Sequence, residues 1–389
     1  MQNNITKAKR IGIDARFYGP VGKGLGRYTQ EIVDNILKLD QQNKYVIFLC
    51  KENFNEFDDS KNIKKVLADA KWYSFTEQIK MPWLIWKEHL DLMHFPHFNV
   101  PIFCPTKFIV TIHDLILTKF PTTRATTLGP ILYKIKNFFY KLVIWLAVKR
   151  AKKIITVSHF TKNDIMKKFK IKTERIIVTY EGVANFTKGR EGQEIDDKKI
   201  ILGYNINSFH KDVQNKPFLF YVGNAYPHKN LEGLIKVYIE IYKSNPNLAL
   251  ILVGKEDYFY KRLKDFANKL NIKVIFPGYV PDNQLGILYR QALAYVFPSF
   301  YEGFGLPALE AMAYGCPVVS SNQASMPEIL GNAAIYFNPY NEKEMANQIK
   351  KIIEDDNLRQ TLIKKGLEQV KKYSWQECAK ETLAIYHQI

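Results

Sequence analysis

A chain of 389 residues that is 47% apolar and 14% aromatic can form two or three globular domains, and this composition excludes an intrinsically disordered protein. Its four cysteines have neither disulfide nor zinc-ligand spacing, which excludes a disulfide-built fold and fits a reducing compartment. The formal net charge of +18 is uneven: residues 1–200 hold 35 Lys and Arg against 20 Asp and Glu, or +15, and residues 201–389 hold 21 against 18, or +3. Such asymmetry indicates an anionic partner for the first half.

The amino-terminal segment, MQNNITKAKRIGIDARF, has no apolar core after its charges and does not resemble a signal peptide. No stretch approaches the roughly 18 apolar residues that span a bilayer. We therefore expect a cytoplasmic protein.

Short β-branched and aromatic runs alternate with helical patterns along both halves, as in a βαβ series. The strands expected in the first half are 10–16, 45–50, 92–95, 108–114, 153–158 and 175–180, and those in the second half are 218–223, 248–254, 273–278, 294–299, 317–321 and 334–337. Many are apolar on consecutive residues, which is typical of strands buried on both faces of a parallel sheet.

The sequence thus predicts the α/β class with two doubly wound, Rossmann-like domains facing across a cleft. The expected domains are 1–183 and 218–372, joined by a polar linker at 184–217 and followed by an amphipathic helix at 373–389. We expect this last helix to pack back towards the first domain.

Loops at the carboxyl ends of parallel strands bind the ligands of such sheets, and the loop SFYEGFGLPALEAMAYG is the first candidate. A strand is followed by a glycine turn and then by a helix that begins near Pro307. Gly303 and Gly305 permit close approach of a phosphate to backbone amides at a helix start. Glu302 and Glu310 flank this turn, and a pair of carboxylates with a glycine turn between them indicates a functional site.

The stretch YVGNAYPHKNLEGLI also follows a strand, and it places Lys229 before a helix for which Asn230 is the expected N-cap. A lysine there can neutralise a phosphate. His228 is a weaker candidate for substrate binding.

Three features of the first half point to the same edge of its sheet. Gly22, Gly24 and Gly26 are expected to form a mobile loop before a helix, without the spacing of a dinucleotide fingerprint. A strand delivers His113 and Asp114 to its carboxyl end, and His97 follows a neighbouring strand.

The pattern EGFGLPALEAMAYGCPVVSS, with VGNAYPHKNL upstream, resembles retaining nucleotide-sugar glycosyltransferases of the GT-B fold, in particular glycosyltransferase family 4 with its "glycosyl transferases group 1" domain. The resemblance is strong over 218–340 and looser over 1–183. It implies a donor-binding second domain and an acceptor-binding first domain.

The resemblance also implies roles for individual residues. Lys229 and the amides of Gly303, Phe304, Gly305 and Leu306 would hold the donor diphosphate, Glu310 the ribose, and Glu302 the sugar hydroxyls. Gly278, Tyr279 and Val280, in the turn FPGYV, would lie against the base. His113 would lie near the transferred sugar. The glycine segment at 22–26 would close over both substrates, with Gly24 and Gly26 at the donor. Gly22, Asp114 and His97 would lie at the acceptor. Asn224 stands where many members carry an arginine, and its amide would contact phosphate without adding charge.

The chain has no Asp-x-Asp pair, no P-loop pattern and no metal-ligand spacing, so we expect no cofactor and no metal requirement. Glu302, placed at sugar hydroxyls, leaves no carboxylate for a double displacement, which favours a metal-independent front-face mechanism in which the leaving diphosphate helps to deprotonate the acceptor. Catalytic roles are expected for His113, Glu302 and Lys229.

Residues 129–153 carry seven Lys and Arg, no acid and several aromatic residues, a pattern typical of a helix on an anionic membrane surface. We expect peripheral association with the inner face of the cytoplasmic membrane and a lipid-linked or oligosaccharide acceptor in surface polysaccharide or lipopolysaccharide assembly. GDP-mannose is the first choice of donor, because the stretch YVGNAYPHKNL resembles the corresponding stretch of bacterial mannosyltransferases. A UDP-hexose is the alternative. A tandem-Rossmann oxidoreductase or epimerase and a nucleic-acid-binding protein are weaker alternatives, since no dinucleotide fingerprint or nucleic-acid motif is present.

Overall fold

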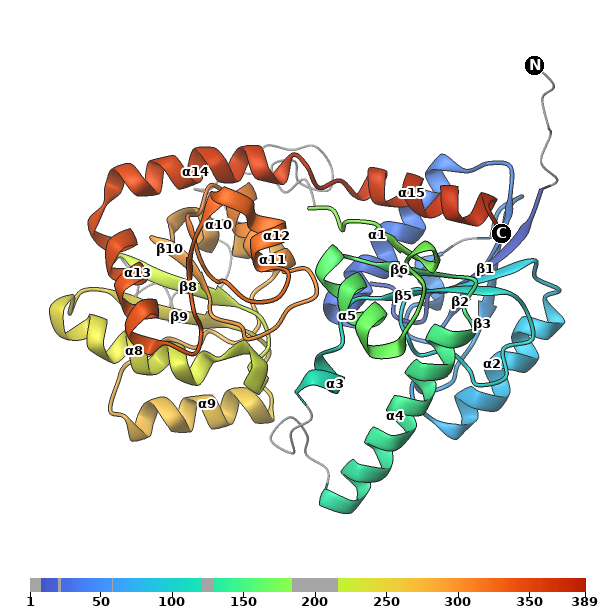
Figure 1. Ribbon diagram of the computed structural model, residues 1–389, viewed down its shortest axis with the longest axis horizontal. Helices are drawn as coiled ribbons and strands as arrows, with labels where there is room; N and C mark the ends of the chain where they lie inside the picture. The colour runs from blue at the N-terminus through green and yellow to red at the C-terminus, as the bar shows by residue number, and fades with distance from the viewer. Residues whose placement is uncertain (1–7, 20–21, 58, 121–128, 184–215) are drawn as a thin grey trace. The chain divides into compact units, whose positions relative to one another are not determined.

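The computed structural model describes residues 8–19, 22–57, 59–120, 129–183 and 216–389, which fold into two compact units (Figure 1). Unit 1 comprises the described residues up to Thr118, those from 129 to Gly182, and Ser374–Ile389. Unit 2 comprises the described residues of Val183–Tyr373. The expected linker, apart from residues 216 and 217, lies outside the described residues.

Unit 1 is built on a seven-stranded parallel sheet with the strand order β3-β2-β1-β4-β5-β6-β7. Its strands are β1 (Arg10–Asp14), β2 (Lys44–Leu49), β3 (Ile63–Leu67), β4 (Leu92–Phe95), β5 (Phe108–Ile112), β6 (Lys153–Thr156) and β7 (Ile176–Val178). The strand order reverses between β1 and β4, so the loops after these two strands flank the position where doubly wound sheets bind ligands.

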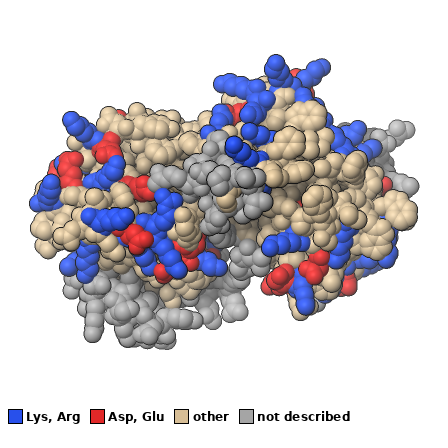
Figure 2. Space-filling model, turned by 90° about the horizontal axis from the view of Figure 1, so that it is seen from below, with Lys and Arg blue, Asp and Glu red and all other residues tan. Residues whose placement is uncertain are grey.

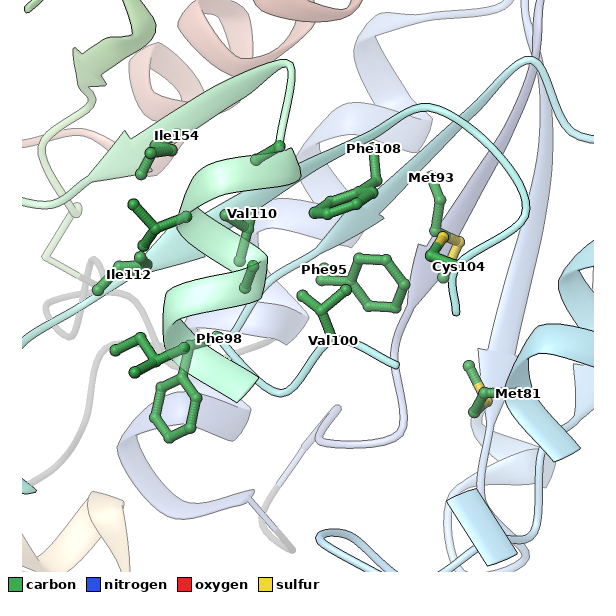
Figure 3. Close-up of a cluster of buried hydrophobic side chains, with 14 of the residues drawn as sticks. Met81, Met93, Phe95, Phe98, Val100, Cys104, Phe108, Val110, Ile112 and Ile154 are labelled. Atoms are coloured by element: carbon green, nitrogen blue, oxygen red, sulfur yellow. The ribbon is translucent and has the colours of Figure 1, made fainter. Parts of the chain in front are cut away.

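Helices cover both faces of this sheet. On one face α1 (Lys23–Leu39) packs against α15 (Trp375–His387). On the other face α2 (Phe75–Lys87), α4 (Pro130–Arg150) and α5 (His159–Phe169) pack on a single apolar cluster that includes Met81, Phe95 and Val110 (Figure 3). Short helices are α3 (Ile116–Lys119) and the 3₁₀ turns Phe54–Glu56 and Thr173–Arg175. Ser74 and Ser158 cap α2 and α5 through their side chains, as their positions before the apolar runs require.

The carboxyl-terminal helix is fixed to unit 1 by a buried polar link. The Tyr386 hydroxyl lies 2.6 Å from Nδ1 of His94, whose Nε2 lies 2.9 Å from the Thr111 hydroxyl. Burial, together with the nearby charge of His113, lowers the pKa of His94 to about 3, so the ring is neutral. The prediction that the last helix packs back towards the first domain is confirmed.

Unit 2 has a five-stranded parallel sheet with the order β12-β11-β10-β8-β9. The strands are β8 (Phe218–Val222), β9 (Ala249–Val253), β10 (Ala294–Phe297), β11 (Val318–Ser321) and β12 (Ala334–Phe337). The helices are α8 (Leu231–Ser244), α9 (Tyr258–Lys269), α10 (Asp282–Gln291), α11 (Leu306–Ala313), α12 (Met326–Leu330), α13 (Glu342–Glu354) and α14 (Asp356–Val370), with 3₁₀ turns at Pro227–Lys229 and Gly331–Ala333. The helices α8 and α13 pack together on one side, whereas α11 packs against α14 on the other (Figure 1). The predicted α/β class with two parallel-sheet domains is confirmed.

One predicted strand is absent, one strand was missed, and one predicted N-cap residue lacks a capping bond. Residues 273–278 form no strand; Ile275 makes only an isolated bridge with Ile251, because the chain turns at Pro277 and at Gly278, where φ is +82°. Residues 63–67 form the edge strand β3, which sequence reasoning missed because its residues are polar or half-exposed. Asn230 precedes α8, but its side chain makes no capping bond and donates instead to the Pro339 carbonyl at 3.1 Å.

The glycine-rich segment of unit 1 is helical at the positions expected to be a loop. The helix α1 begins at Lys23, so Gly24 and Gly26 lie in its first turns, and Gly22 is the N-cap residue. A Cβ on Gly26 would lie 2.0 Å from the Gly19 carbonyl oxygen. Gly26 is therefore needed because the helix start lies against the loop after β1, and not for loop mobility.

Candidate active site

The loops after β8 and β10 meet at the strand-order switch of unit 2, and they carry opposite charges. Lys229, in the 3₁₀ turn after β8, places its Nζ 2.6 Å from Oε1 of Glu302, which follows β10. Both side chains are nearly buried, with 13% and 10% of their surfaces exposed. The lysine Nζ also lies 5.8 Å from the centre of the Phe297 ring. Two of the predicted site residues thus form a preorganised ion pair at the ligand-binding edge of the sheet.

Ser325, which precedes α12, donates hydrogen bonds to the turn after Glu302. The Ser325 hydroxyl lies 3.0 Å from the carbonyl oxygen of Glu302 and 3.4 Å from that of Phe304. Gly305 has φ of +99° and caps α11, and a Cβ there would lie 2.6 Å from the Met326 side chain. The backbone from Gly303 to Leu306 is therefore locked in a conformation that only glycine permits at position 305.

Glu310 projects from α11 into a buried site rather than into open solvent. The Tyr289 hydroxyl, on α10, lies 3.3 Å from Oε2 of Glu310 and 3.2 Å from the Pro307 carbonyl oxygen. Burial and the negative charge of Glu310 raise the pKa of Tyr289, so this hydroxyl remains a neutral donor. Tyr289 thus fixes the position of the Glu310 carboxylate.

Further buried tyrosines close the carboxyl ends of the strands in unit 2. The hydroxyls of Tyr221, Tyr260 and Tyr295 donate to main-chain carbonyls of Asn224, Gly223 and Val222, at 3.0, 2.9 and 3.3 Å. These bonds satisfy carbonyl groups that no sheet partner reaches at the strand ends. They also fix the direction in which the β8 loop leaves the sheet and hence the place of Lys229.

The remaining donor-site candidates of unit 2 lie in the neighbouring loops. The side-chain oxygen of Asn224 accepts from the Tyr226 amide at 3.3 Å, so its amide stabilises its own loop. His228 is buried; burial, followed by the charge of Lys229, lowers its pKa to about 4. Gly278 accepts from the Gly254 amide at 3.0 Å, and Tyr279 is exposed beside it.

In unit 1 the predicted His113 has an acceptor on each ring nitrogen. Nε2 donates to the Pro96 carbonyl at 2.9 Å, and Nδ1 lies 3.0 Å from Oε1 of Glu181. Burial alone would lower the pKa of His113, but the hydrogen bond and charge of Glu181 and the Pro96 carbonyl outweigh it and raise the pKa. The edge of the Tyr28 ring packs against the imidazole at 4.5 Å between centroids. The arrangement favours a positively charged ring that is held in place.

Two other candidates of unit 1, Asp114 and His97, lie after β5 and β4. Asp114 accepts from the Ile116 amide at 2.8 Å and so shapes the turn after β5. The ring of His97 packs against Phe98 at 3.9 Å, and its buried Nδ1 has no hydrogen-bond partner among the described residues. Burial lowers the pKa of His97 to about 3.

Sequence reasoning missed Glu181, Ser325 and Tyr289. Each acts on a predicted site residue from a different element, and no local spacing signals that contact. In the described part of the chain, no group of three or more His, Cys, Asp or Glu is gathered that could hold a metal ion. Nor is any helix there long and apolar enough to cross a membrane.

Solved structures share this fold over nearly the whole chain. WaaG, a glycosyltransferase involved in lipopolysaccharide biosynthesis, superposes with a TM-score of 0.72 at 14% identity, over 97% of this chain and 99% of WaaG. Anabaena HepE in complex with UDP and glucose superposes with a TM-score of 0.71 at 16% identity, over 98% and 100% of the two chains. The fold is that of the GT-B glycosyltransferases.

Sequence relatives narrow the class of glycosyltransferase. The family model of glycosyl transferases group 1 matches residues 205–369, and that of glycosyltransferase family 4 matches residues 23–184. The O-antigen chain mannosyltransferase B of Escherichia coli is 27% identical over 384 residues, which cover 93% of this chain and 95% of that protein. The O-antigen chain mannosyltransferase RfbU of Salmonella typhimurium is 29% identical over 282 residues, or 72% and 70% of the two chains. The chain is a glycosyltransferase and belongs to this group 1 and family 4 class, as its motifs predicted.

Proposed function

We propose that this enzyme transfers mannose, with retention of configuration, from GDP-mannose to a lipid-linked or oligosaccharide acceptor in surface polysaccharide assembly. Two relatives that align with most of the chain are named O-antigen chain mannosyltransferases, which supports both the sugar and the pathway. The Lys229–Glu302 pair at the switch point of unit 2 is the observation that carries the proposal. It offers a cation for a diphosphate beside a carboxylate for sugar hydroxyls.

In this proposal the donor extends along the carboxyl edge of unit 2. Lys229 and the amides of Gly303–Leu306 hold the diphosphate, at the start of α11. Glu310, oriented by Tyr289, binds the ribose hydroxyls. Glu302 binds hydroxyls of the sugar, and the turn that contains Tyr279 lies against the base. No metal ligand is assigned, because Lys229, the amides and the helix dipole supply the positive charge that the diphosphate requires.

The chemistry we propose is a front-face displacement. A covalent intermediate needs a free carboxylate behind the anomeric carbon. Glu302, the carboxylate nearest to this position, is assigned here to the sugar hydroxyls, so no carboxylate is left to act as the nucleophile. The leaving diphosphate, stabilised by Lys229, instead accepts the proton of the acceptor hydroxyl. The pairing with Glu181 raises the pKa of His113 and occupies its Nδ1, while Nε2 donates to the Pro96 carbonyl, so we assign His113 to positioning and charge stabilisation beside the sugar, and not to general base catalysis.

A UDP-hexose donor is the second candidate, because HepE, a protein of the same fold, has been solved in complex with UDP and glucose. Calorimetric titration with GDP-mannose, UDP-glucose, UDP-galactose, UDP-GlcNAc and dTDP-rhamnose decides between the donors. We expect GDP-mannose to bind tightest, with Lys229→Ala weakening binding about tenfold or more. Preference for a UDP-sugar would overturn the mannose assignment, and a strict Mg²⁺ requirement for transfer would overturn the role given to Lys229.

We also propose that the enzyme works at the inner face of the cytoplasmic membrane, where a lipid-linked acceptor would be presented. The helix α4 supports this, because its described side chains include Lys134, Lys136, Lys141, Lys149 and Arg150, and its sequence contains no acid. Binding to anionic vesicles at low salt tests the proposal, and absence of binding by a protein that still binds donor would refute it.

A further inference from the structure

The helix α2 is apolar on both sides, although only one side is buried. Its inner residues Met81, Leu84 and Ile85 belong to the core cluster of unit 1. Its outer side carries large apolar residues at intervals of four, four and three positions: Phe75 is 82% exposed, Ile79 74%, Trp83 53% and Trp86 64%. A helix that is apolar all round is normally buried all round, and a contiguous exposed apolar surface marks an interaction site.

The segment between α2 and α4 is anchored to both helices. Gln78 of α2 accepts from the Ile102 amide at 2.8 Å, and the Arg150 guanidinium of α4 donates to the carbonyls of Ile102 and Cys104. Phe103, between these anchored residues, is exposed. Both helices pack on the same core cluster, so their outer sides belong to one layer of unit 1. The outer side of α4 adds four more large apolar residues, namely Ile135, Phe138, Phe139 and Trp145.

The charges around this apolar surface are positive. On α2 and just before it stand Lys71, Lys80 and Lys87, the last 5.3 Å from the centre of the Trp83 ring. The carboxylates of α2 and of its C-cap, Glu77 and Glu88, are buried and paired with cations of unit 1, whereas Asp69, before the helix, is exposed. In Figure 2, the unit on the right shows a broad area of uncharged residues, with lysine and arginine above it and both basic and acidic residues below it.

We propose that the outer sides of α2 and α4, with Phe103 between them, form one membrane-docking surface in which the apolar residues of α2 enter the headgroup–acyl boundary of an anionic leaflet. The proposal rests on the lipid-linked acceptor assigned above and names the surface that meets the lipid. Tryptophan with lysine beside it is the side-chain combination that occupies a bilayer interface. Each nearby cation adds attraction to anionic headgroups.

A second copy of the chain is the rival occupant of this surface. In a two-fold dimer the same surface faces itself, so the lysines of both copies would be brought together. Glu77 and Glu88 are already paired and cannot neutralise them, and the exposed Asp69 offers one carboxylate against Lys71, Lys80 and Lys87. The charge pattern therefore favours a negatively charged leaflet over self-association.

The test is co-sedimentation of the full chain with vesicles of phosphatidylglycerol and phosphatidylethanolamine, and with phosphatidylcholine vesicles as the uncharged reference. The variant Ile79→Ser/Trp83→Ser removes two exposed side chains without touching the core. We expect it to bind the anionic vesicles at least about tenfold more weakly, since each side chain loses its apolar burial. The matched control is Tyr340→Ser/Leu367→Ser, which removes two exposed apolar side chains from unit 2 and should leave vesicle binding unchanged.

Tryptophan quenching by brominated lipid adds a reading of position. The wild type should be quenched, and the quenching should fall in Trp83→Phe/Trp86→Phe. Unchanged vesicle binding by Ile79→Ser/Trp83→Ser would overturn the proposal. So would a wild-type dimer, without vesicles, that this variant converts to monomer in sedimentation velocity. Vesicle binding requires no donor, so a failure of the mannose assignment in the donor panel leaves this result standing, and the reverse also holds.

Discussion

Neutralising Glu302 should have opposite effects on a nucleotide diphosphate and on a nucleotide sugar. In the unliganded protein, the Lys229 Nζ lies 2.6 Å from the Glu302 carboxylate, and both side chains are nearly buried. A hydrogen bond between charged groups of this kind contributes about 1.5–3 kcal/mol net. A diphosphate that recruits Lys229 must offset part of this contribution. Glu302→Gln removes the competing charge and its repulsion of the phosphates.

We therefore expect Glu302→Gln to bind GDP more tightly by about half of that contribution, or roughly four- to tenfold. The same variant should lose affinity for GDP-mannose relative to GDP, because the sugar hydroxyls lose a charged acceptor, and kcat should fall by about 100-fold. Isothermal titration with both ligands measures the first two effects, and a transfer assay measures the third.

Glu310→Gln is the matched control, because Glu310 is held by Tyr289 and is assigned to the ribose. It should weaken GDP and GDP-mannose alike, by about tenfold each. If Glu302→Gln weakened GDP as Glu310→Gln does, the two carboxylates would not have separate roles. The assignment of Glu302 to the sugar would then be wrong.

Three further substitutions test the framework of the two units. Arg16→Met should destabilise unit 1 by about 3–5 kcal/mol in urea unfolding, because it strands the buried carboxylates of Asp14 and Glu77, each within 2.7 Å of the guanidinium. Glu181→Gln should lower the pKa of His113, which an NMR titration measures. Because that pKa is raised in the folded protein, the His113–Glu181 pair stabilises the folded state fully below about pH 6.5, and this stabilisation is lost as the pH rises through the folded pKa. Gly305→Ala should abolish donor binding and destabilise unit 2 by about 2 kcal/mol or more, whereas Gly278→Ala, which has φ of +82° but open space around its Cβ, should cost only about 1 kcal/mol. An NMR titration unchanged in Glu181→Gln, or equal losses at the two glycines, would contradict these assignments.

The alternation of strands and helices was predictable from the sequence because most strands of both sheets are buried on both faces. Their apolar runs are therefore continuous, as in β5 and β9, whose residues are all buried. The edge strand β3 could not be found in this way, since only one neighbour and little core constrain its side chains. Residues 273–278 were predicted as a strand from their β-branched residues, but the turn at Pro277 and Gly278 limits the pairing to one bridge.

Part of the candidate site was predictable because its residues are local in sequence. Glu302, Gly305 and Glu310 lie in one strand–turn–helix unit, and Lys229 lies in another. The groups that fix them are not local: Ser325 reaches the turn from the start of α12, and Tyr289 reaches Glu310 from α10. Contacts of this kind depend on how helices pack around the sheet, which residue spacing does not encode.

The charges of the candidate sites obey one physical rule in both units. Each nearly buried cation has an anionic partner at hydrogen-bond distance: Lys229 has Glu302, and His113 has Glu181. An unpaired charge at such depth is costly, so the unliganded protein must carry these partners. A diphosphate can replace Glu302 at Lys229 because it offers the same charge to the same Nζ. We expect no comparable exchange at His113, because its Nε2 is bound to a neutral carbonyl and Glu181, on the other ring nitrogen, raises the pKa of the ring. Under the proposed function the two pairs therefore suit different tasks: Lys229 exchanges partners when the donor binds, whereas His113 keeps Glu181.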